Sequence, residues 1–302
     1  MTRYLRRTFL FLLPLIALMG AFELALRRIP NDYSFTSERL REHGDSIDVL
    51  ILGNSHGFNG INPEGLGSQG YNAASIGQDH QRDRAIMRHF AHHLPSLQHV
   101  IIPVSYFSIG SRIEQGREPW RVKNFVIHMG MRDEATLLEH RFELLNHPKP
   151  KLIRMLLDHW LNGEDNRSCG DYGGGINRPK PGLDMHADAR ATVERHSCDD
   201  PARYWWNMEH LKAIIAIASE HGAQVHLVFP PMHPAYLEIA DTSQLRFARA
   251  IGRQLAQRHE TVSYHDLSAD SRFTDADFSN SDHLGATGRR KFTMILADTL
   301  GL

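Results

Sequence analysis

The hydrophobic positions of the chain form short continuous runs that alternate with longer segments of helical spacing. A run that is apolar throughout is typical of a strand buried on both faces of a parallel sheet. The predicted strands cover residues 47–53, 70–75, 99–107, 223–231 and 261–268. Amphipathic spacing predicts helices at residues 82–94, 204–222, 242–259 and 286–300. This alternation predicts an α/β fold, with a parallel sheet and helices on both of its faces.

Residues 108–200 interrupt this alternation. They are rich in charge, glycine and proline, and we interpret them as an insertion between the third and fourth strands. The two cysteines of the chain, Cys169 and Cys198, both lie there. A disulfide between them would hold a loop-rich segment and would suit an oxidising compartment, while two free thiols are the alternative.

The first segment is apolar and flanked by basic residues. Residues 8–26 are almost wholly hydrophobic, and at ~1.5 Å per residue they span about 28 Å, close to the ~30 Å of a hydrocarbon core. We predict a membrane anchor at residues 1–28, a polar linker at 29–45 and one folded domain at 46–302. A cleaved signal peptide is the alternative, although its apolar region would be long. Arginines on both sides of the span leave its orientation open.

Composition narrows the class of partner only a little. The formal charge of −1 gives no electrostatic grip on nucleic acid. Histidine is abundant, with 20 residues, but the histidines are scattered. A metal site formed from His56, His233, His283 and an aspartate lacks the usual ligand spacing, so we expect no metal and no cofactor.

Ser55 follows the first predicted strand in the stretch "ILGNSHGFNG". Ligands of a parallel sheet bind at the carboxyl ends of its strands, so a serine just past the first predicted strand would face that edge. Gly53 permits a tight turn, and the N–H of Ser55 could stabilise an oxyanion. Ser55 is therefore either a nucleophile, which needs a base, or an ordinary turn serine.

His283 lies in "SDHLGATG", just before the last predicted helix. That helix would return beside the first strand, so His283 could reach Ser55 and act as its base. A carboxylate should orient the imidazole. The nearby acids are Asp275, Asp277 and Asp282.

These two stretches resemble the SGNH (GDSL-like) hydrolase superfamily, and in particular its membrane-anchored branch, which assists polysaccharide O-acetylation and teichoic acid D-alanylation. Further likeness lies in "ELALRR" before residue 29, "GINP" at 60–63, "YNAASIGQ" at 71–78 and "PPMHPAY" at 230–236. Residues 108–200 carry none of it. The resemblance implies an SGNH-type, flavodoxin-like parallel sheet behind one N-terminal transmembrane helix.

Carried over by position, the resemblance makes Ser55 the nucleophile and His283 the base. It places Gly77, with Asn72 before it, where the family supplies an oxyanion N–H. The family's third motif offers an asparagine, but "VSYFSIG" has none, so Ser105 or a backbone group would have to substitute. The family's acid normally lies three residues before the histidine.

That position holds Asn280. An amide can orient an imidazole but supplies no negative charge. Asp282 is the adjacent carboxylate, and Asp277 lies six residues upstream. The sequence leaves a Ser–His dyad, an Asn-assisted triad and a displaced acid as alternatives.

We therefore expect an extracytoplasmic serine O-acyltransferase or esterase, held in the cytoplasmic (inner) membrane with its domain in the periplasm. It would act on O-acyl groups of an envelope polysaccharide or polymer through an acyl-enzyme. His56 and His233 are candidate substrate-binding residues, and the resemblance implies a multi-pass membrane O-acyltransferase as partner. The alternatives are a catalytically degraded scaffold that binds polymer or partner, and a plain carboxylesterase.

Overall fold

The computed structural model describes residues 2–302 apart from 68, 147 and 180. The chain forms two compact units. One contains Met1–Ser37 and Pro119–Ser168, and the other contains Glu38–Glu118 and Cys169–Leu302. The second unit holds the sheet, and each unit is described by itself.

The sheet has five strands, all parallel, in the order β2-β1-β3-β4-β5. The strands are β1 (Val49–Ile51), β2 (Gly70–Asn72), β3 (His99–Pro103), β4 (Gln224–Phe229) and β5 (Val262–Asp266). The predicted α/β class and all five strand positions are confirmed, although each strand is shorter than its apolar run. This order is the flavodoxin-like one, and it reverses between β1 and β3; sheets of this kind bind ligands at the carboxyl edge of such a switch point.

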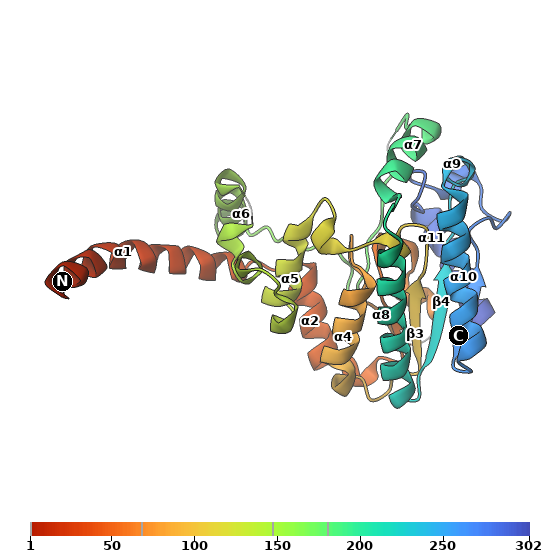
Figure 1. The fold of residues 1–302 in the computed structure, drawn as a ribbon, viewed down its shortest axis with the longest axis horizontal. Helices are drawn as coiled ribbons and strands as arrows, with labels where there is room; N and C mark the ends of the chain where they lie inside the picture. Colours follow the sequence, from red (N-terminus) through yellow and green to blue (C-terminus); the bar gives the residue numbers. More distant parts are fainter. Residues whose placement is uncertain (1, 68, 147, 180) are drawn as a thin grey trace. The chain divides into compact units, whose positions relative to one another are not determined.

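Helices cover both faces of the sheet (Figure 1). Tyr264 of β5 lies against Gly252 of α10 (Thr242–Arg258). Val228 of β4 packs instead with Phe292 of α11 (Ala286–Leu300). Tyr264 is the register partner of Leu227, the neighbour of Val228. Because successive residues of a strand point to opposite faces, α10 and α11 lie on opposite sides.

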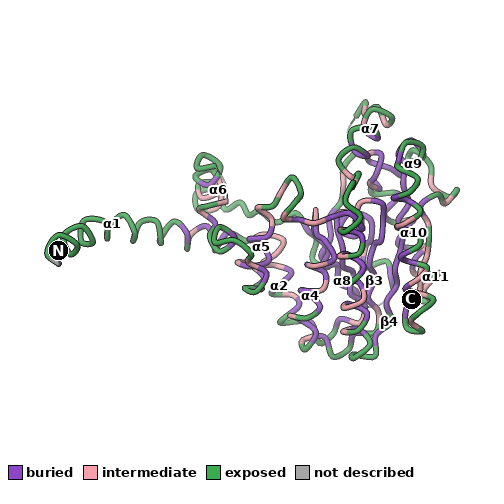
Figure 2. The backbone as a smooth tube through the Cα atoms, viewed as in Figure 1, coloured by how far each residue is buried: buried purple, intermediate pink, exposed green. Residues whose placement is uncertain are grey.

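The remaining helices of this unit fill the same two layers. Helix α4 (His80–Phe90) contacts α8 (Pro201–Glu220), while the short α3 (Ser55–Gly60) contacts α11. Helices α7 (Met185–His196) and α9 (Pro234–Ile239) contact each other. Figure 2 shows the strands as the buried centre of this unit. Helix α11 matches its predicted bounds, and α4, α8 and α10 lie within a few residues of theirs.

The other unit is built around the end of the apolar first helix. It contains α1 (Thr2–Arg27), α5 (Val122–Ile127), α6 (Lys149–Asn162) and the start of α2 (Asp32–Glu42). Leu26, Ile29 and Leu152 form its small buried core. Helix α1 is long and apolar enough to cross a membrane, with a mean hydropathy of 2.3, and a signal sequence would meet the same criteria. Helix α2 occupies much of the stretch predicted as a linker.

The insertion is divided between the units, which the sequence did not indicate. Residues 119–168 belong with α1, whereas residues 169–200, including α7, belong with the sheet. No disulfide joins Cys169 and Cys198, so the structure has the second of the two alternatives, two thiols. The Cys198 thiol is directed instead at the carbonyl of Asp200, 3.5 Å away.

Candidate active site

Ser55 is placed by a sharp turn at the carboxyl edge of the sheet. Gly53 has φ +102°, and a Cβ on it would come within 2.8 Å of Pro103, so the turn requires glycine. The N–H of Gly53 donates to the buried Asp83 carboxylate at 2.8 Å. Asn54 caps α3 by accepting the N–H of His56 at 2.9 Å. Ser55 is therefore the first residue of α3, just past the carboxyl end of β1.

His283 reaches Ser55 from the other end of the chain. Its Nε2 lies 2.8 Å from the Ser55 Oγ, across 228 positions of sequence. The histidine stands in the loop between the turn at Asp275–Asp277 and α11. The predicted return of the last helix beside the first strand is therefore found, and it brings a hydroxyl and an imidazole within hydrogen-bond reach.

Asn280 fixes the orientation of this imidazole. Its Oδ1 accepts the backbone N–H of His283 at 2.8 Å and that of Asp282 at 3.3 Å. Since two donors identify that atom as the oxygen, Nδ1 of His283, 3.2 Å away, must carry the proton that is donated to it. Nε2 is then the acceptor for the Ser55 hydroxyl, as a general base requires.

Asp282 supplies the negative charge beside the same ring. Its Oδ1 lies 2.8 Å from Nδ1 of His283, closer than the amide of Asn280. Among the described residues the two Asp282 oxygens accept no well-aligned hydrogen bond. The N–H direction therefore favours Asn280, while the Coulomb attraction of the carboxylate does not depend on that alignment. The adjacent acid contributes charge, and the amide at the family's acid position contributes alignment.

The two groups shift each other's pKa in opposite directions. Burial alone would raise the pKa of Asp282, but the neighbouring His283 and His56 outweigh it and hold that pKa well below its usual value. Burial alone would lower the pKa of His283, but Asp282 raises it above the usual 6.5. Both shifts favour an ion pair once His283 has taken a proton.

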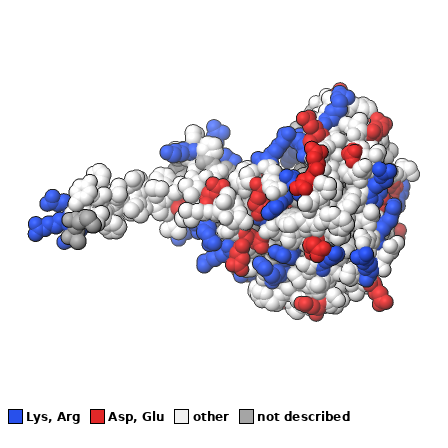
Figure 3. Space-filling view, in the orientation of Figure 1, with Lys and Arg blue, Asp and Glu red and all other residues white. Residues whose placement is uncertain are grey.

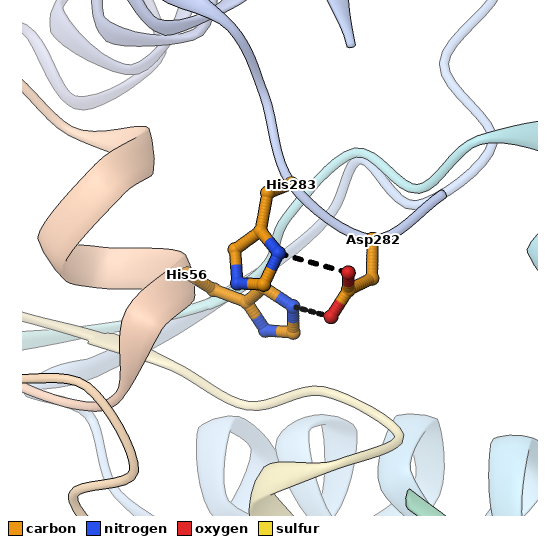
Figure 4. A group of neighbouring side chains, drawn as sticks. All are labelled: His56, Asp282 and His283. Atoms are coloured by element: carbon orange, nitrogen blue, oxygen red, sulfur yellow. Dashed lines mark ion pairs between the residues drawn. The ribbon is translucent and has the colours of Figure 1, made fainter. Parts of the chain in front are cut away.

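Asp282 is also shared with two further histidines. Nε2 of His56 lies 3.7 Å from its Oδ2, so His56 and His283 each face a different oxygen of the carboxylate (Figure 4). Nδ1 of His56 contacts the Ser105 hydroxyl at 3.1 Å. Burial lowers the pKa of His56, so this ring stays neutral. Ser105, a candidate substitute for the family's asparagine, is thus engaged with His56.

His196 and Tyr236 complete the surroundings of Asp282. Nδ1 of His196 is 3.9 Å from the carboxylate and 3.0 Å from the Tyr236 hydroxyl. Burial lowers the pKa of His196 to about 3. Sequence reasoning missed His196 because it lies on α7, inside the insertion.

Helix α7 also holds the loop that carries the base. The Asp188 carboxylate accepts the N–H of Ser281 at 3.0 Å and its hydroxyl at 2.6 Å. Nothing in the sequence connects residue 188 with residue 281. The pair fixes the backbone immediately before Asp282 and His283.

Two of the candidate oxyanion donors stay available and one does not. Within the described residues, the backbone N–H groups of Ser55 and Gly77 make no hydrogen bond. The side chain of Asn72, the third candidate, is engaged in other contacts. Its Nδ2 donates to the carbonyls of Gly57 and Ile61 at 2.9 and 3.0 Å, and its Oδ1 accepts from Ala74. Asn72 braces the turn after Ser55.

Other predicted residues lie at the edge of the site. His233 caps α9 by accepting the N–H of Ala235 at 3.1 Å, and its Nε2 pairs with Asp275 at 3.2 Å. Both ring nitrogens are thus committed to structure, which argues against the expected substrate contact. Asp277 accepts from Lys291 and Thr274, so it does not orient His283.

A small cavity opens beside the reactive pair. Its volume is about 10 Å³, room for one water molecule. Pro230 and Pro231 form one wall. The residues that line it are Ser55, His56, Asn59, Gly60, Pro230, Pro231, Asp282, His283 and Leu284. His56 therefore reaches the cavity as expected.

The nitrogens and oxygens of His56, Asp282 and His283 lie within 4.8 Å of one another, so these side chains could also hold a metal ion. A His₂Asp set is a common zinc environment. An ion there would occupy the same Asp282 and His283 that face Ser55. Metal binding and serine chemistry at this site would therefore compete.

Comparison with known proteins adds little to this geometry. The sequence matches no protein-family model and no curated protein. Among solved structures, one match is a Bacteroides fragilis protein provisionally described as an acylhydrolase. The two share 11% identity and a TM-score of 0.39, over 87% of this chain and 96% of the other. A likeness at that score carries nothing over to this chain, whose proposed function depends on its own site.

Proposed function

We propose that the chain is a serine esterase or O-acyltransferase of the SGNH type. The observation that carries this proposal is the contact of 2.8 Å between the Ser55 Oγ and the His283 Nε2, at the carboxyl edge of the sheet. Asn280 and Asp282 behind the imidazole support its use as a base. A nucleophile, a base and a group that orients the base are the three parts of a serine triad.

The reaction would proceed in two balanced steps. The Ser55 oxygen attacks the carbonyl carbon of an ester while His283 accepts the hydroxyl proton. The tetrahedral oxyanion is held by the N–H groups of Ser55 and Gly77, and it collapses as His283 returns the proton to the departing alcohol. A second hydroxyl, from a polymer or from water, then loses its proton to His283 and attacks the acyl-enzyme. The serine leaves with that proton, and an ester or an acid is released.

The small cavity favours a short acyl group. The space beside Ser55 admits about one water molecule, so the methyl of an acetyl group would fit there with less rearrangement than a long chain. An envelope polysaccharide is the acceptor that the family resemblance implies, and a multi-pass O-acyltransferase is the partner that it implies. A non-catalytic scaffold is disfavoured because Ser55, His283 and a buried carboxylate are all in reach of one another.

We further propose that α1 remains attached as a membrane anchor. Its last turn contributes to a folded unit, because Glu23 accepts the N–H groups of Glu143 and Leu144 at 3.0 Å each. Leu26 is also buried there. A signal sequence that is removed would not need such contacts. N-terminal sequencing of the protein purified from its membrane should find residues 2–22 still present, and a start after residue 22 would contradict the anchor.

The catalytic proposal is tested on the full chain in detergent. It should hydrolyse p-nitrophenyl acetate faster than p-nitrophenyl butyrate, and a fluorophosphonate probe should label Ser55. Ser55→Ala should remove both signals. Ser243→Ala is the matched control, because Ser243 is an exposed serine in the first turn of a helix, and it should change neither. Ester hydrolysis that persists in Ser55→Ala would overturn the proposal.

A further inference from the structure

Helix α6 carries apolar side chains on two faces. One face contributes the buried Leu152, with Met155 and Leu156 packed beside it, to the core at the end of α1. The other face is exposed. Its members are Ile153, Leu157, Trp160 and Leu161, with exposed fractions of 54, 49, 56 and 75%.

The exposed set forms one stripe, here called the α6 stripe. Its positions are spaced i, i+4, i+7 and i+8, the pattern of a single helical face. Lys151, Arg154 and Asp158 lie on the remaining side of the helix. Isolated exposed apolar residues are ordinary, but a contiguous stripe with charged neighbours marks a surface that another phase or molecule covers.

The location of α6 indicates what covers the stripe. Helix α6 contacts the carboxyl end of α1, where the exposed apolar stretch of α1 ends and its buried residues begin. In Figure 1, α6 runs across the direction of α1 rather than along it. If α1 crosses a bilayer, a helix in that position lies at the membrane surface, roughly in its plane.

The charges and the aromatic residue fit that location. Helix α6 carries Lys149, Lys151 and Arg154, and the helix that it contacts, α1, ends at Arg27. Figure 3 shows basic side chains over α6 and none along the middle of α1. Tryptophan is enriched at membrane interfaces, where its ring is apolar and its N–H is polar. Lysine and arginine there would meet the phosphates of anionic lipids.

We propose that the α6 stripe lies in the boundary between the headgroups and acyl chains of an anionic lipid bilayer. Helix α1 and residues 119–168 then form a membrane-seated unit with two attachments, one spanning and one interfacial. This inference concerns attachment and does not depend on the esterase chemistry. It does require that α1 be embedded, so a chain that has lost α1 is not a suitable sample.

Tryptophan quenching by brominated lipids tests this proposal. The full chain is reconstituted into vesicles of phosphatidylcholine and phosphatidylglycerol, with and without bromine on the acyl chains. Bromine should quench part of the tryptophan emission of the wild type, and Trp160→Phe should remove more than half of that quenching. Trp205→Phe is the matched control, because Trp205 is similarly exposed, at 53%, on α8 of the sheet unit, and it should leave the quenching unchanged.

Two results would overturn the proposal. One is equal lipid quenching in Trp160→Phe and in the wild type. The other is a Trp160 that acrylamide reaches freely in pure lipid vesicles but not in native membranes, which would identify a protein partner as the cover. As a second measurement, a nitroxide on Leu157→Cys, with both native cysteines replaced, should be more accessible to oxygen than to an aqueous nickel complex. A label on Asp158→Cys should show the reverse.

Discussion

At the residue scale, the imidazole of His283 faces two different groups through one nitrogen. Asn280 accepts its N–H and, by accepting two backbone N–H groups as well, cannot turn its amide away. Asp282 lies nearer but off the N–H axis, and it acts through charge. Orientation and electrostatic stabilisation, which one carboxylate commonly provides together, are here divided between neighbouring residues.

Asp282→Asn should separate charge from alignment. The base must be neutral to accept a proton, so kcat/KM rises with pH through the pKa of His283, which Asp282 holds above 6.5. Loss of the carboxylate lowers that pKa, and the acid limb of the profile moves to lower pH. The plateau should also fall, by about 10²–10⁴-fold. A pH–rate profile with p-nitrophenyl acetate measures both.

Asn280→Ala should act differently. It removes the aligned acceptor and leaves the carboxylate, so the plateau falls while the acid limb stays in place. Asn280→Asp keeps an acceptor oxygen and nearly the same side-chain size, so it serves as the control for the loss of side-chain volume in Asn280→Ala. An acid limb that moves equally in Asp282→Asn and Asn280→Ala would contradict the division of tasks.

At the element scale, helix α7 supports the loop that carries His283. No pattern in the sequence links these two segments. Asp188 binds Ser281 through both its N–H and its hydroxyl, one residue before Asp282. A displacement of this loop would move His283 away from Ser55. The insertion therefore contributes a support to the site, in addition to its part in the α1 unit.

A double-mutant cycle of Asp188→Ala and Ser281→Ala tests this support. Each change should lower kcat for p-nitrophenyl acetate about tenfold, equivalent to ~1.4 kcal/mol. The double variant should lose little more than Asp188→Ala alone, because Asp188→Ala already removes the hydroxyl contact that Ser281→Ala removes. Circular dichroism and the melting temperature serve as the control for folding. Losses that multiply in the double variant would show that the two residues act separately.

The elements differ in how far the sequence could predict them. The strands and α11 could be predicted because buried positions recur along each of them with the period of a strand or a helix. The end of α11 could be predicted because Gly301, with φ +71°, follows it. Ser55 and His283 could be paired because the last helix of the fold returns beside the first strand, and α11 does contact α3. The roles of Asp188 and His196 could not be foreseen, since they depend on how an irregular insertion folds back. The structural use of Asn72 and His233 was hidden for the same reason: loop hydrogen bonds leave no periodic signal.

At the scale of the whole molecule, many histidines are buried and neutral. Burial lowers the pKa of His56, of His196 to about 3, and of His210 and His226 to about 4. At pH values below 6.5 but above these lowered pKa values, the histidines of the unfolded chain bind protons that the same histidines of the folded chain do not. Stability therefore falls as pH falls through that window. His283 opposes this, because its raised pKa adds stability that is fully present below pH 6.5 and is lost as pH rises.

The balance predicts a protein that acid destabilises. Four depressed histidines outweigh one raised histidine, so the free energy of unfolding should drop on the order of a few kcal/mol between pH 7.5 and 5. Urea denaturation of the full chain in detergent at the two pH values measures this. His226→Gln, which removes one buried titrating group far from Ser55 in sequence, should reduce the drop. Equal stability at both pH values would contradict the predicted protonation linkage.

The distance of 228 residues between Ser55 and His283 has a consequence for how the chain is made. The nucleophile leaves the ribosome early, soon after α1, but its base and the carboxylate beside it are among the last residues to be translated. A growing chain cannot attack an ester until synthesis is nearly complete. With the proposed chemistry, a product that stops between residues 60 and 283, for example at a nonsense codon, would keep Ser55 and α1 and yet be inert.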